Sequence, residues 1–272
     1  MMPDYKLLVV DIDGTIIDKR GAISDADRDA LAAAAAAGVR VALSTGRVVR
    51  SCRKIMQQLS LDGCHIFYDG ALVSDPSQDI EIYSQPIETE LVRQAVEFAR
   101  ANDIYLELYT TESFYAEREN WSDYIHAEFF GVSAIITSFD GIWDRERVIK
   151  AEMITRDEVG QEQARLLRQE FEGKLGFSIA RSPTFPGIDF VNVINNGVSK
   201  GEALKELAAH LGISTGEVLA IGDGLNDISL LETAGLAVAM GNAFPEVKRV
   251  ADCITLDVEQ SGVAAAVKKL LL

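Results

Sequence analysis

Strand-like apolar runs and helical stretches alternate at the N-terminal end of the sequence, and this alternation limits the folds open to the chain. Residues 6–10 (KLLVV) precede a helical stretch over 24–38, a second strand-like run over 39–44 and a second helical stretch over 47–59. Such an order is typical of βαβ units, in which successive strands lie parallel and a helix crosses between them. We therefore expect an α/β fold built on a Rossmann-like core with a parallel sheet.

The C-terminal part of the chain repeats this alternation. Its expected strands are residues 190–194 (FVNVI), 217–222 (EVLAIG) and 236–241 (LAVAMG), and its expected helices are residues 200–212, 228–235 and 262–272. Both ends of the chain therefore contribute to the same kind of layer, and we expect them to form one sheet together.

The middle of the chain has a different texture. Aromatic and charged residues are more frequent there, apolar residues alternate over 104–117, and residues 156–176 have a helical pattern. We expect a separate α+β insertion over residues 84–188 and a core formed by residues 1–83 and 189–272.

Composition and charge exclude several classes of protein. The 272 residues are 48% hydrophobic and 25% charged, as in ordinary globular proteins, and the net charge of -16 argues against nucleic-acid or anionic membrane surfaces. The longest small-apolar stretch, residues 31–39, is too short to cross a bilayer, and the N-terminus lacks a secretory pattern. We expect a cytoplasmic protein with no membrane partner. Its three cysteines lack metal-binding spacing and are expected to be inert thiols.

Polar clusters follow four of the apolar or strand-like segments. Since the carboxyl ends of parallel strands lie along one edge of a sheet, we expect these clusters to converge there. The clusters supply the side chains of Asp11, Asp13, Thr45, Lys200, Asp223, Asn226 and Asp227.

Four aspartates packed together would repel one another and raise one another's pKa. A hard divalent cation removes this conflict. Mg²⁺ prefers oxygen ligands and typically binds one or two carboxylates together with a substrate phosphate, which fits a cluster without His or Cys. Lys200 and the groups around Thr45, Gly46 and Arg47 are available for the remaining phosphate oxygens.

Lys200 gives separate support for an anion at this place. Ser199 and Glu202 have the spacing of a capping box, so Lys200 falls in the first helical turn. A cation there opposes the helix dipole by roughly 0.3–1 kcal/mol and is stabilised by a nearby anion.

These motifs resemble those of the haloacid dehalogenase (HAD) superfamily. The resemblance rests on DIDGT at 11–15, STGR at 44–47, Lys200 in GVSKGEAL and GDGLND at 222–227. The insertion between the second and third motifs, with AVAMGNA after the fourth, resembles the Cof-type phosphatases with a type II cap. The resemblance implies that residues 84–188 are the α+β cap domain and that residues 1–83 and 189–272 are the catalytic core.

The resemblance implies a role for each site residue. Asp11 would attack phosphorus and form an aspartyl-phosphate, and Asp13 would act as general acid and base. Mg²⁺ would be bound by Asp11, the backbone carbonyl of Asp13 and Asp223, with Asp227 in support. The phosphate would be held by Thr45, Gly46, Arg47, Lys200 and Asn226, with Lys200 also stabilising the transition state.

One residue departs from the Cof-type pattern. Relatives of this type usually carry Asn-Gly-Ala after the third core strand, where this chain has Asp69 followed by Gly70 and Ala71. We expect a change in the turn or in the rim that faces the cap, with the chemistry left untouched. Three basic residues of the cap, Arg156, Arg165 and Arg181, are candidate substrate contacts or ordinary surface residues.

Other sites fit the sequence less well. Gly197 to Gly201 spell G-x-S-x-G, the pattern of an α/β-hydrolase nucleophile elbow, but the one later histidine, His210, lies in the same expected helix and cannot complete a triad. An EF-hand loop fails because Gly14 is at position 4 from Asp11 instead of position 6.

The sequence thus predicts a Mg²⁺-dependent phosphatase acting on a small phosphorylated metabolite, such as a sugar phosphate. Two alternatives stay open: a phosphomutase on the same scaffold, and a phosphometabolite-binding protein without turnover. The sequence specifies neither the metabolite nor the oligomeric state.

Overall fold

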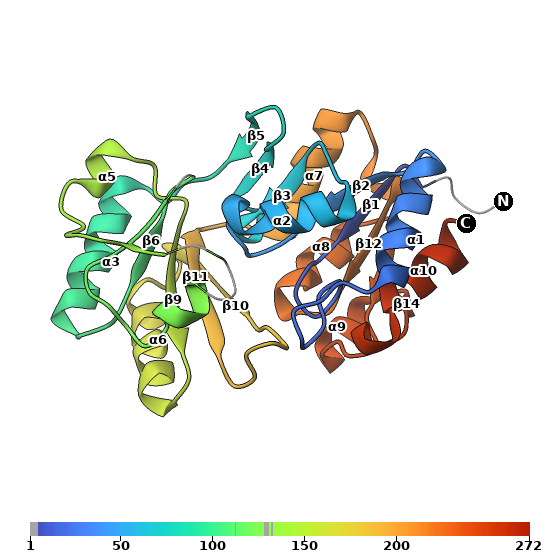
Figure 1. The fold of residues 1–272 in the computed structure, drawn as a ribbon. Coiled ribbons are helices and arrows are strands. Elements are labelled where there is room, and N and C mark those ends of the chain that lie inside the picture. The colour runs from blue at the N-terminus through green and yellow to red at the C-terminus, as the bar shows by residue number, and fades with distance from the viewer. Residues whose placement is uncertain (1–4, 112, 128–130, 132) are drawn as a thin grey trace.

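The computed structural model of the protein describes residues 5–111, 113–127, 131 and 133–272. It has two lobes (Figure 1). One lobe is built around a five-stranded sheet and the other around a six-stranded sheet, and a three-stranded sheet accompanies the first. In the described part of the chain, no helix has the length and apolarity needed to cross a membrane.

The five-stranded sheet confirms the parallel core that the sequence predicts. Its strand order is β14-β13-β12-β1-β2, and every pairing in it is parallel. The two central strands are buried along their whole length, which explains their nearly continuous apolar sequences. The strands are β1 (Leu7–Val10), β2 (Arg40–Leu43), β12 (Val218–Gly222), β13 (Leu236–Ala239) and β14 (Cys253–Ile254).

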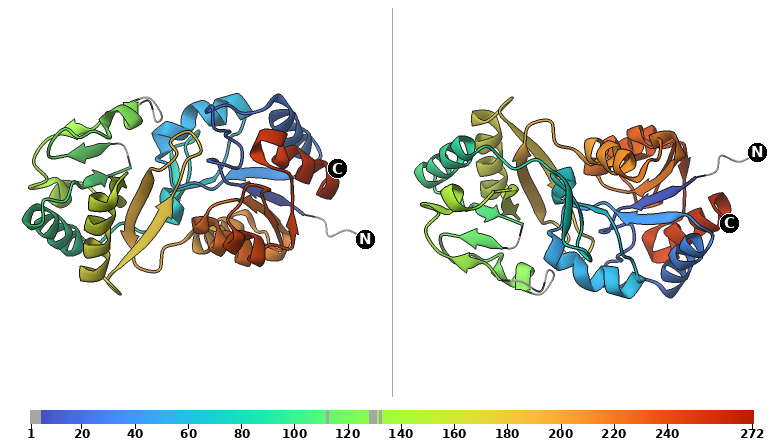
Figure 2. Two further views of the ribbon diagram at one scale, coloured as in Figure 1. Left: turned by 90° about the horizontal axis from the view of Figure 1, so that it is seen from below. Right: turned by 90° about the horizontal axis from the view of Figure 1, so that it is seen from above.

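Helices cover both faces of the parallel sheet. On one face α1 packs against α2 and α10, and on the other α7 packs against α8 (Figure 2). Ser24 caps α1 by accepting a hydrogen bond from the Asp27 amide, and Ser199 caps α7 in the same way, as its sequence predicts. The helices are α1 (Asp25–Ala36), α2 (Val49–Leu59), α7 (Lys200–Leu211), α8 (Ile228–Thr233), α9 (Pro245–Val250) and α10 (Gly262–Leu270).

A small antiparallel sheet extends the core next to β2. It consists of β3 (His65–Phe67), β4 (Leu72–Asp75) and β5 (Ile80–Ser84). A single parallel bridge between Ser44 and Ile66 joins it to the end of β2. The turn between β3 and β4 contains Asp69, and this turn faces the second lobe.

The second lobe is a mixed sheet with strand order β10-β11-β9-β6-β7-β8. Two longer helices, α3 and α6, cover one of its faces (Figure 1). Its strands are β6 (Glu107–Tyr109), β7 (Phe114–Ala116), β8 (Ile135–Ile136), β9 (Lys150–Thr155), β10 (Leu175–Ala180) and β11 (Asp189–Asn195). Its helices are α3 (Thr89–Ala101), α4 (Asp123–Ile125), α5 (Ile142–Arg145) and α6 (Glu158–Glu170).

Residues along the inner strands of this second sheet alternate between two faces. Leu108, Ala151, Met153, Val191 and Val193 belong to the hydrophobic cluster that includes residues of α3 and α6. Because successive side chains of a strand point to opposite faces, the residues between them point away from these helices. These intervening residues are polar and buried: Glu107, Tyr109, Lys150, Glu152 and Asn192.

The expectation that residues 190–194 form a core strand is wrong. Strand β11 pairs antiparallel with β9 and β10 in the second sheet, beyond the expected domain boundary at residue 188. An apolar run of this length fits a buried core strand and a cap strand equally well, so length and apolarity alone do not distinguish them. The division into residues 1–83 and 189–272 against 84–188 stays a prediction. Because β11 pairs within the second sheet, we propose to move the end of the inserted segment from residue 188 to the end of β11.

Candidate active site

Three neighbouring strands of the parallel sheet bring the predicted site residues together. Asp11 follows β1, Asp223 follows β12, and Thr45 comes two residues after the end of β2. Because β12, β1 and β2 are adjacent and parallel, all three residues emerge at the same edge of the sheet. This convergence is the one that the sequence predicts.

Lys200 reaches the same place from the first turn of α7. Its ammonium group donates to Asp11 Oδ1 at 2.7 Å and to Asp227 Oδ1 at 2.6 Å, and its side chain is fully buried. Burial lowers the pKa of Lys200, but the charges of Asp11 and Asp227 raise it by more. The pKa of Lys200 therefore lies above the ordinary value for lysine. Lys200 is therefore a buried cation fixed between two acidic groups.

Asp227 holds the loop after β12 in shape. Its Oδ2 accepts hydrogen bonds from the amides of Asp223 and Gly224, at 3.0 and 2.9 Å. A Cβ atom on Gly222 would lie 2.7 Å from the Asp227 carboxyl group, so the loop needs glycine there. With Oδ1 bonded to Lys200, both oxygens of Asp227 have partners within the protein.

Asp223 lies beside this group and faces Asp11. Its Oδ1 accepts a hydrogen bond from the Thr15 hydroxyl at 2.8 Å. Burial, then the charge of Asp227, raises the pKa of Asp223 to about 8, and burial together with Asp227 raises the pKa of Asp11 well above its ordinary value. Lys200 alone does not balance the negative charge at this place.

The donor set suits a hard divalent cation. Ligand atoms of Asp11, Asp223 and Asp227 lie within 4.8 Å of one another, and all three are carboxylate oxygens. Such oxygens are the ligands that Mg²⁺ selects. The residues present therefore fit the predicted metal.

Asp13 forms an ion pair with Arg47. The guanidinium donates to both carboxylate oxygens of Asp13, from Nε at 2.7 Å and from Nη2 at 2.6 Å. Arg47 is buried, and its amide donates to the Thr45 hydroxyl at 3.1 Å. Arg47 of the second motif thus orients the side chain of Asp13 in the first motif.

Asn226 is bonded to Asp69. Its Nδ2 donates to Asp69 Oδ1 at 2.8 Å. The other oxygen of Asp69 accepts from Ser178 Oγ and from Asn192 Nδ2, each at 2.6 Å. Ser178 and Asn192 lie on β10 and β11, so Asp69 links both lobes.

A family model for haloacid dehalogenase-like hydrolases matches residues 8–267 of this chain. The chain belongs to the haloacid dehalogenase-like hydrolases. This HAD protein is 30% identical over 269 residues to a Bacillus subtilis enzyme, 5-amino-6-(5-phospho-D-ribitylamino)uracil phosphatase, covering 99% of this chain and 97% of the relative.

Solved structures of HAD proteins agree over nearly the whole chain. One is a haloacid dehalogenase-like hydrolase from Bacteroides thetaiotaomicron, with 28% identity, a TM-score of 0.83 and coverage of 97% of this chain and 99% of that one. Another is a subclass IIB sugar phosphatase, with 27% identity, a TM-score of 0.82 and coverage of 97% and 98%. This chain is an enzyme, a HAD phosphatase, and the resemblance to the Cof type is confirmed.

A cavity of about 540 Å³ lies between the two lobes of the HAD phosphatase. Asp11, Asp13 and Asp223 line it from the core, and Lys150, Glu152 and other polar residues line it from the second sheet. Of the three cap arginines that the sequence singles out, Arg181 lines this cavity, whereas Arg156 stacks over Trp121 and Arg165 pairs with Glu162 on an exposed helix.

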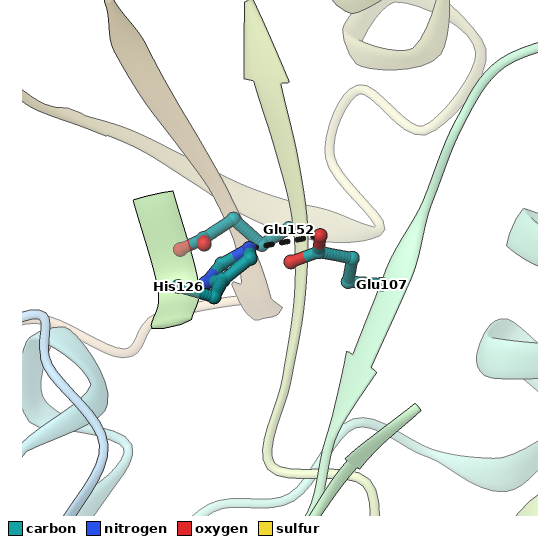
Figure 3. Close-up of side chains that lie close together, drawn as sticks. All are labelled: Glu107, His126 and Glu152. Carbon is teal, nitrogen blue, oxygen red and sulfur yellow. Dashed lines mark hydrogen bonds and ion pairs between the residues drawn. The ribbon is translucent and has the colours of Figure 1, made fainter. Parts of the chain in front are cut away.

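A second cluster of potential ligands lies in the inserted lobe of the HAD phosphatase: Glu107 on β6, Glu152 on β9, and His126 directly after α4 (Figure 3). Its groups already bind one another and their neighbours. His126 Nε2 lies 2.9 Å from Glu107 Oε1, the Tyr109 hydroxyl lies 2.7 Å from Glu107 and 3.2 Å from Glu152, and Lys150 donates to Glu152 at 2.5 Å. We interpret the cluster as a polar network at the wall of the cavity whose members already have partners within the protein.

Sequence reasoning missed the contribution of the inserted sheet to this site. Lys150, Glu152 and Asn192 are polar residues within otherwise apolar strands, and that interruption was the available signal. The three cysteines are free, and burial raises the pKa of Cys52 to about 12, in keeping with an inert thiol.

Proposed function

We propose that this HAD phosphatase hydrolyses a small phosphorylated metabolite in a Mg²⁺-dependent reaction through an aspartyl-phosphate on Asp11. One observation supports the proposal most strongly. The Asp11 carboxylate stands at the wall of the cavity beside Asp223, and its Oδ1 is bonded to the buried ammonium of Lys200. A carboxylate held in this way has one oxygen fixed by a cation and the other available for attack.

Asp11 would supply the nucleophilic oxygen. Its attack on phosphorus forms an acyl-phosphate and releases the alcohol of the substrate, and water then cleaves the acyl-phosphate to return the carboxylate. Asp13 would donate a proton to the departing oxygen and then take one from the attacking water. The two-point bond from Arg47 occupies both oxygens of Asp13 in this structure, so proton transfer by Asp13 would require the release of at least one of these bonds.

Mg²⁺ would be held by Asp11, the backbone carbonyl of Asp13 and Asp223, with Asp227 in support. When bound, the ion neutralises negative charge at the phosphoryl group. Asp227 has a second task, because its bonds to Lys200 and to two backbone amides keep the loop after β12 in place.

The phosphate would be held by groups from three motifs. Lys200 supplies a buried charge, Thr45 and Gly46 supply the loop after β2, and Asn226 supplies an amide. One amide hydrogen of Asn226 goes to Asp69, which leaves the other for a phosphate oxygen. Arg47 would act mainly through Asp13.

The cavity limits the size of the substrate. About 540 Å³ accommodates a small metabolite but not a polymer. The inserted lobe lines the cavity with polar residues such as Lys150, Glu152 and Asn192 and with apolar residues such as Ile179, Phe185 and Phe190. The polar residues among them suit a leaving group with several hydroxyls. Sugar and polyol phosphates are therefore the first class to test, and the names of the sugar phosphatase and the ribitylaminouracil phosphatase among the relatives agree with this choice.

A phosphate-release screen over phosphorylated metabolites, with and without Mg²⁺, tests the proposal. We expect release from a subset of sugar or polyol phosphates, dependent on Mg²⁺ and at least about a thousandfold slower in Asp11→Asn. Undiminished activity in Asp11→Asn would contradict the assigned nucleophile. Isomerisation of a bisphosphorylated sugar without net release would indicate a phosphomutase instead.

A further inference from the structure

Asp69 stands at the junction of the two lobes. Its side chain is 2% exposed and its backbone is in the left-handed region, with φ of 55°. The amide of Asp69 donates to the Thr45 carbonyl at 3.0 Å, so its backbone is tied to the loop after β2. Its carboxylate is tied to both lobes.

Every side-chain partner of the Asp69 carboxylate is a hydrogen-bond donor. Asn226 donates to Oδ1 at 2.8 Å, whereas Ser178 and Asn192 donate to Oδ2 at 2.6 Å. An ionised carboxylate accepts at both oxygens. An asparagine at position 69 would accept at one atom only. Its own amide would face an N–H group of Asn192, or it would face Asn226, which would then have to turn its amide over and withdraw the N–H group assigned to phosphate.

Asn192 does not escape this conflict by turning its amide over. Its Oδ1 accepts a hydrogen bond from the Lys150 ammonium at 2.8 Å, and an ammonium group only donates. Lys150 is itself fixed, because it also donates to Glu152 at 2.5 Å and to the Gly46 carbonyl at 3.3 Å. Lys150 therefore determines that Asn192 presents its N–H groups to residue 69.

We propose that Asp69 is a positioning residue that links the inserted sheet to Asn226, and that Lys150 and Asn192 make aspartate the required residue at position 69. The departure from the Asn-Gly-Ala pattern then has a physical cause within this chain. The inference rests on one part of the proposed function, namely that Asn226 holds the phosphate. Three successive hydrogen bonds connect these residues: Lys150 donates to Asn192, Asn192 donates to Asp69, and Asn226 donates to Asp69 from its other side.

An exchange of the two residues tests the proposal. Asp69→Asn places a donor against the donor of Asn192, and Asn192→Asp places two carboxylates together. In the double variant Asp69→Asn/Asn192→Asp, the amide at position 69 donates to the carboxylate at position 192, and that carboxylate still accepts from Lys150. The side-chain oxygen at position 69 still accepts from Asn226. The Ser178 hydroxyl can rotate to accept.

Kinetics with p-nitrophenyl phosphate and inhibition by inorganic phosphate provide the first readout. We expect each single variant to lose about tenfold in kcat/KM and to bind inorganic phosphate about tenfold more weakly, the scale of one charge-assisted hydrogen bond. The double variant should recover to within about threefold of the parent. Two substitutions that act independently of each other would give losses that multiply. Multiplied losses, or an unimpaired Asp69→Asn, would overturn the proposal.

Thermal unfolding provides a readout that does not require activity. The double variant should melt above both single variants, and this result stands even if the chain releases no phosphate from any ester. Should Asn192→Asp fail to fold, Asp69→Asn/Lys150→Gln replaces it, because glutamine accepts as well as donates and allows Asn192 to turn over. A variant Asp69→Asn/Lys150→Gln that melts above Lys150→Gln alone supports the proposal. A double variant that melts no higher than Lys150→Gln alone contradicts it.

Discussion

The Lys200 ammonium lies 2.7 Å from Asp11 Oδ1, although the two residues are 189 positions apart in sequence. Lys200 begins α7, where a cation opposes the helix dipole, and its side chain is fully buried. The carboxylates of Asp11 and Asp227 compensate both costs. This pair therefore connects the stability of the core to the reactivity of its central carboxylate.

Removal of the Lys200 charge should damage both stability and activity. Lys200→Met leaves Asp11 and Asp227 buried without their cation, which costs about 3–5 kcal/mol of unfolding free energy. Urea unfolding measures this loss. The matched control is Lys205→Met on the same helix, since Lys205 pairs with Glu202 at the exposed surface and should change stability by less than about 1 kcal/mol. Equal effects of the two variants would contradict the role given to Lys200.

Asp223 should determine the Mg²⁺ requirement more than the substrate requirement. Asp223→Asn keeps the shape of the side chain but removes a charged ligand, so half-maximal activity should need at least about tenfold more Mg²⁺. A metal titration of phosphate release checks this expectation. The exposed Asp29→Asn variant serves as control, and its titration should match that of the parent. An unchanged midpoint for Asp223→Asn would remove Asp223 from the proposed ligands.

Gly70 should tolerate no side chain, because the turn at Asp69 lies against the start of α7. A Cβ atom on Gly70 would lie 2.2 Å from the carbonyl oxygen of Ser199, and φ of Gly70 is 100°. We expect Gly70→Ala to lower the unfolding free energy by about 3 kcal/mol or more, from strain and from the clash together.

Gly63→Ala separates these two contributions. Gly63 has a similar φ of 94° but open space at its Cβ position, so its variant should lose only about 1–2 kcal/mol. Chemical denaturation of both variants provides the comparison. Equal losses would show that the contact with α7 contributes nothing.

His65 should make the core sensitive to acid. It is fully buried, its Nδ1 accepts a hydrogen bond from the Leu43 amide at 3.1 Å, and burial lowers its pKa to about 4. The unfolded chain binds the proton first as pH falls from about 6.5 towards 4, so the stability that neutral His65 provides is present above pH 6.5 and is lost in that window.

His65→Asn keeps an acceptor for Leu43 but does not titrate. The variant should be less stable at pH 7, since it leaves a cavity, yet between pH 7 and pH 5 it should lose about 2 kcal/mol less than the parent. Urea unfolding at the two pH values measures the difference. Parallel losses in the two proteins would show that His65 does not titrate as its burial implies.

The sequence predicts the core and most of the site because both depend on local patterns. Apolar runs followed by Asp11, Thr45 and Asp223 identify three adjacent strands, and the first turn of α7 identifies Lys200. Contacts between lobes do not follow from such patterns. Asp69 meets Ser178 and Asn192 across 109 and 123 positions, through a strand register that is set only in three dimensions.

Two other findings needed the side-chain geometry. Arg47 has the place in sequence of a phosphate contact, yet its guanidinium binds Asp13. Strand β11 has the apolar sequence of a core strand, yet it lies in the second sheet, and Asn192 at its centre is the residue that distinguishes it. A polar residue inside an apolar run indicates a face that is turned towards a site instead of a hydrophobic core.

Chemical trapping of Asp11 during turnover tests the central claim most directly. Borohydride reduces an acyl-phosphate to an alcohol, so enzyme that is quenched while it hydrolyses a phosphate ester should contain homoserine at position 11. Peptide mass spectrometry then locates the change. We predict homoserine at position 11 in the presence of substrate and Mg²⁺, and none in Asp11→Asn. Rapid phosphate release with unmodified Asp11, or with the change at another carboxylate, would contradict the account.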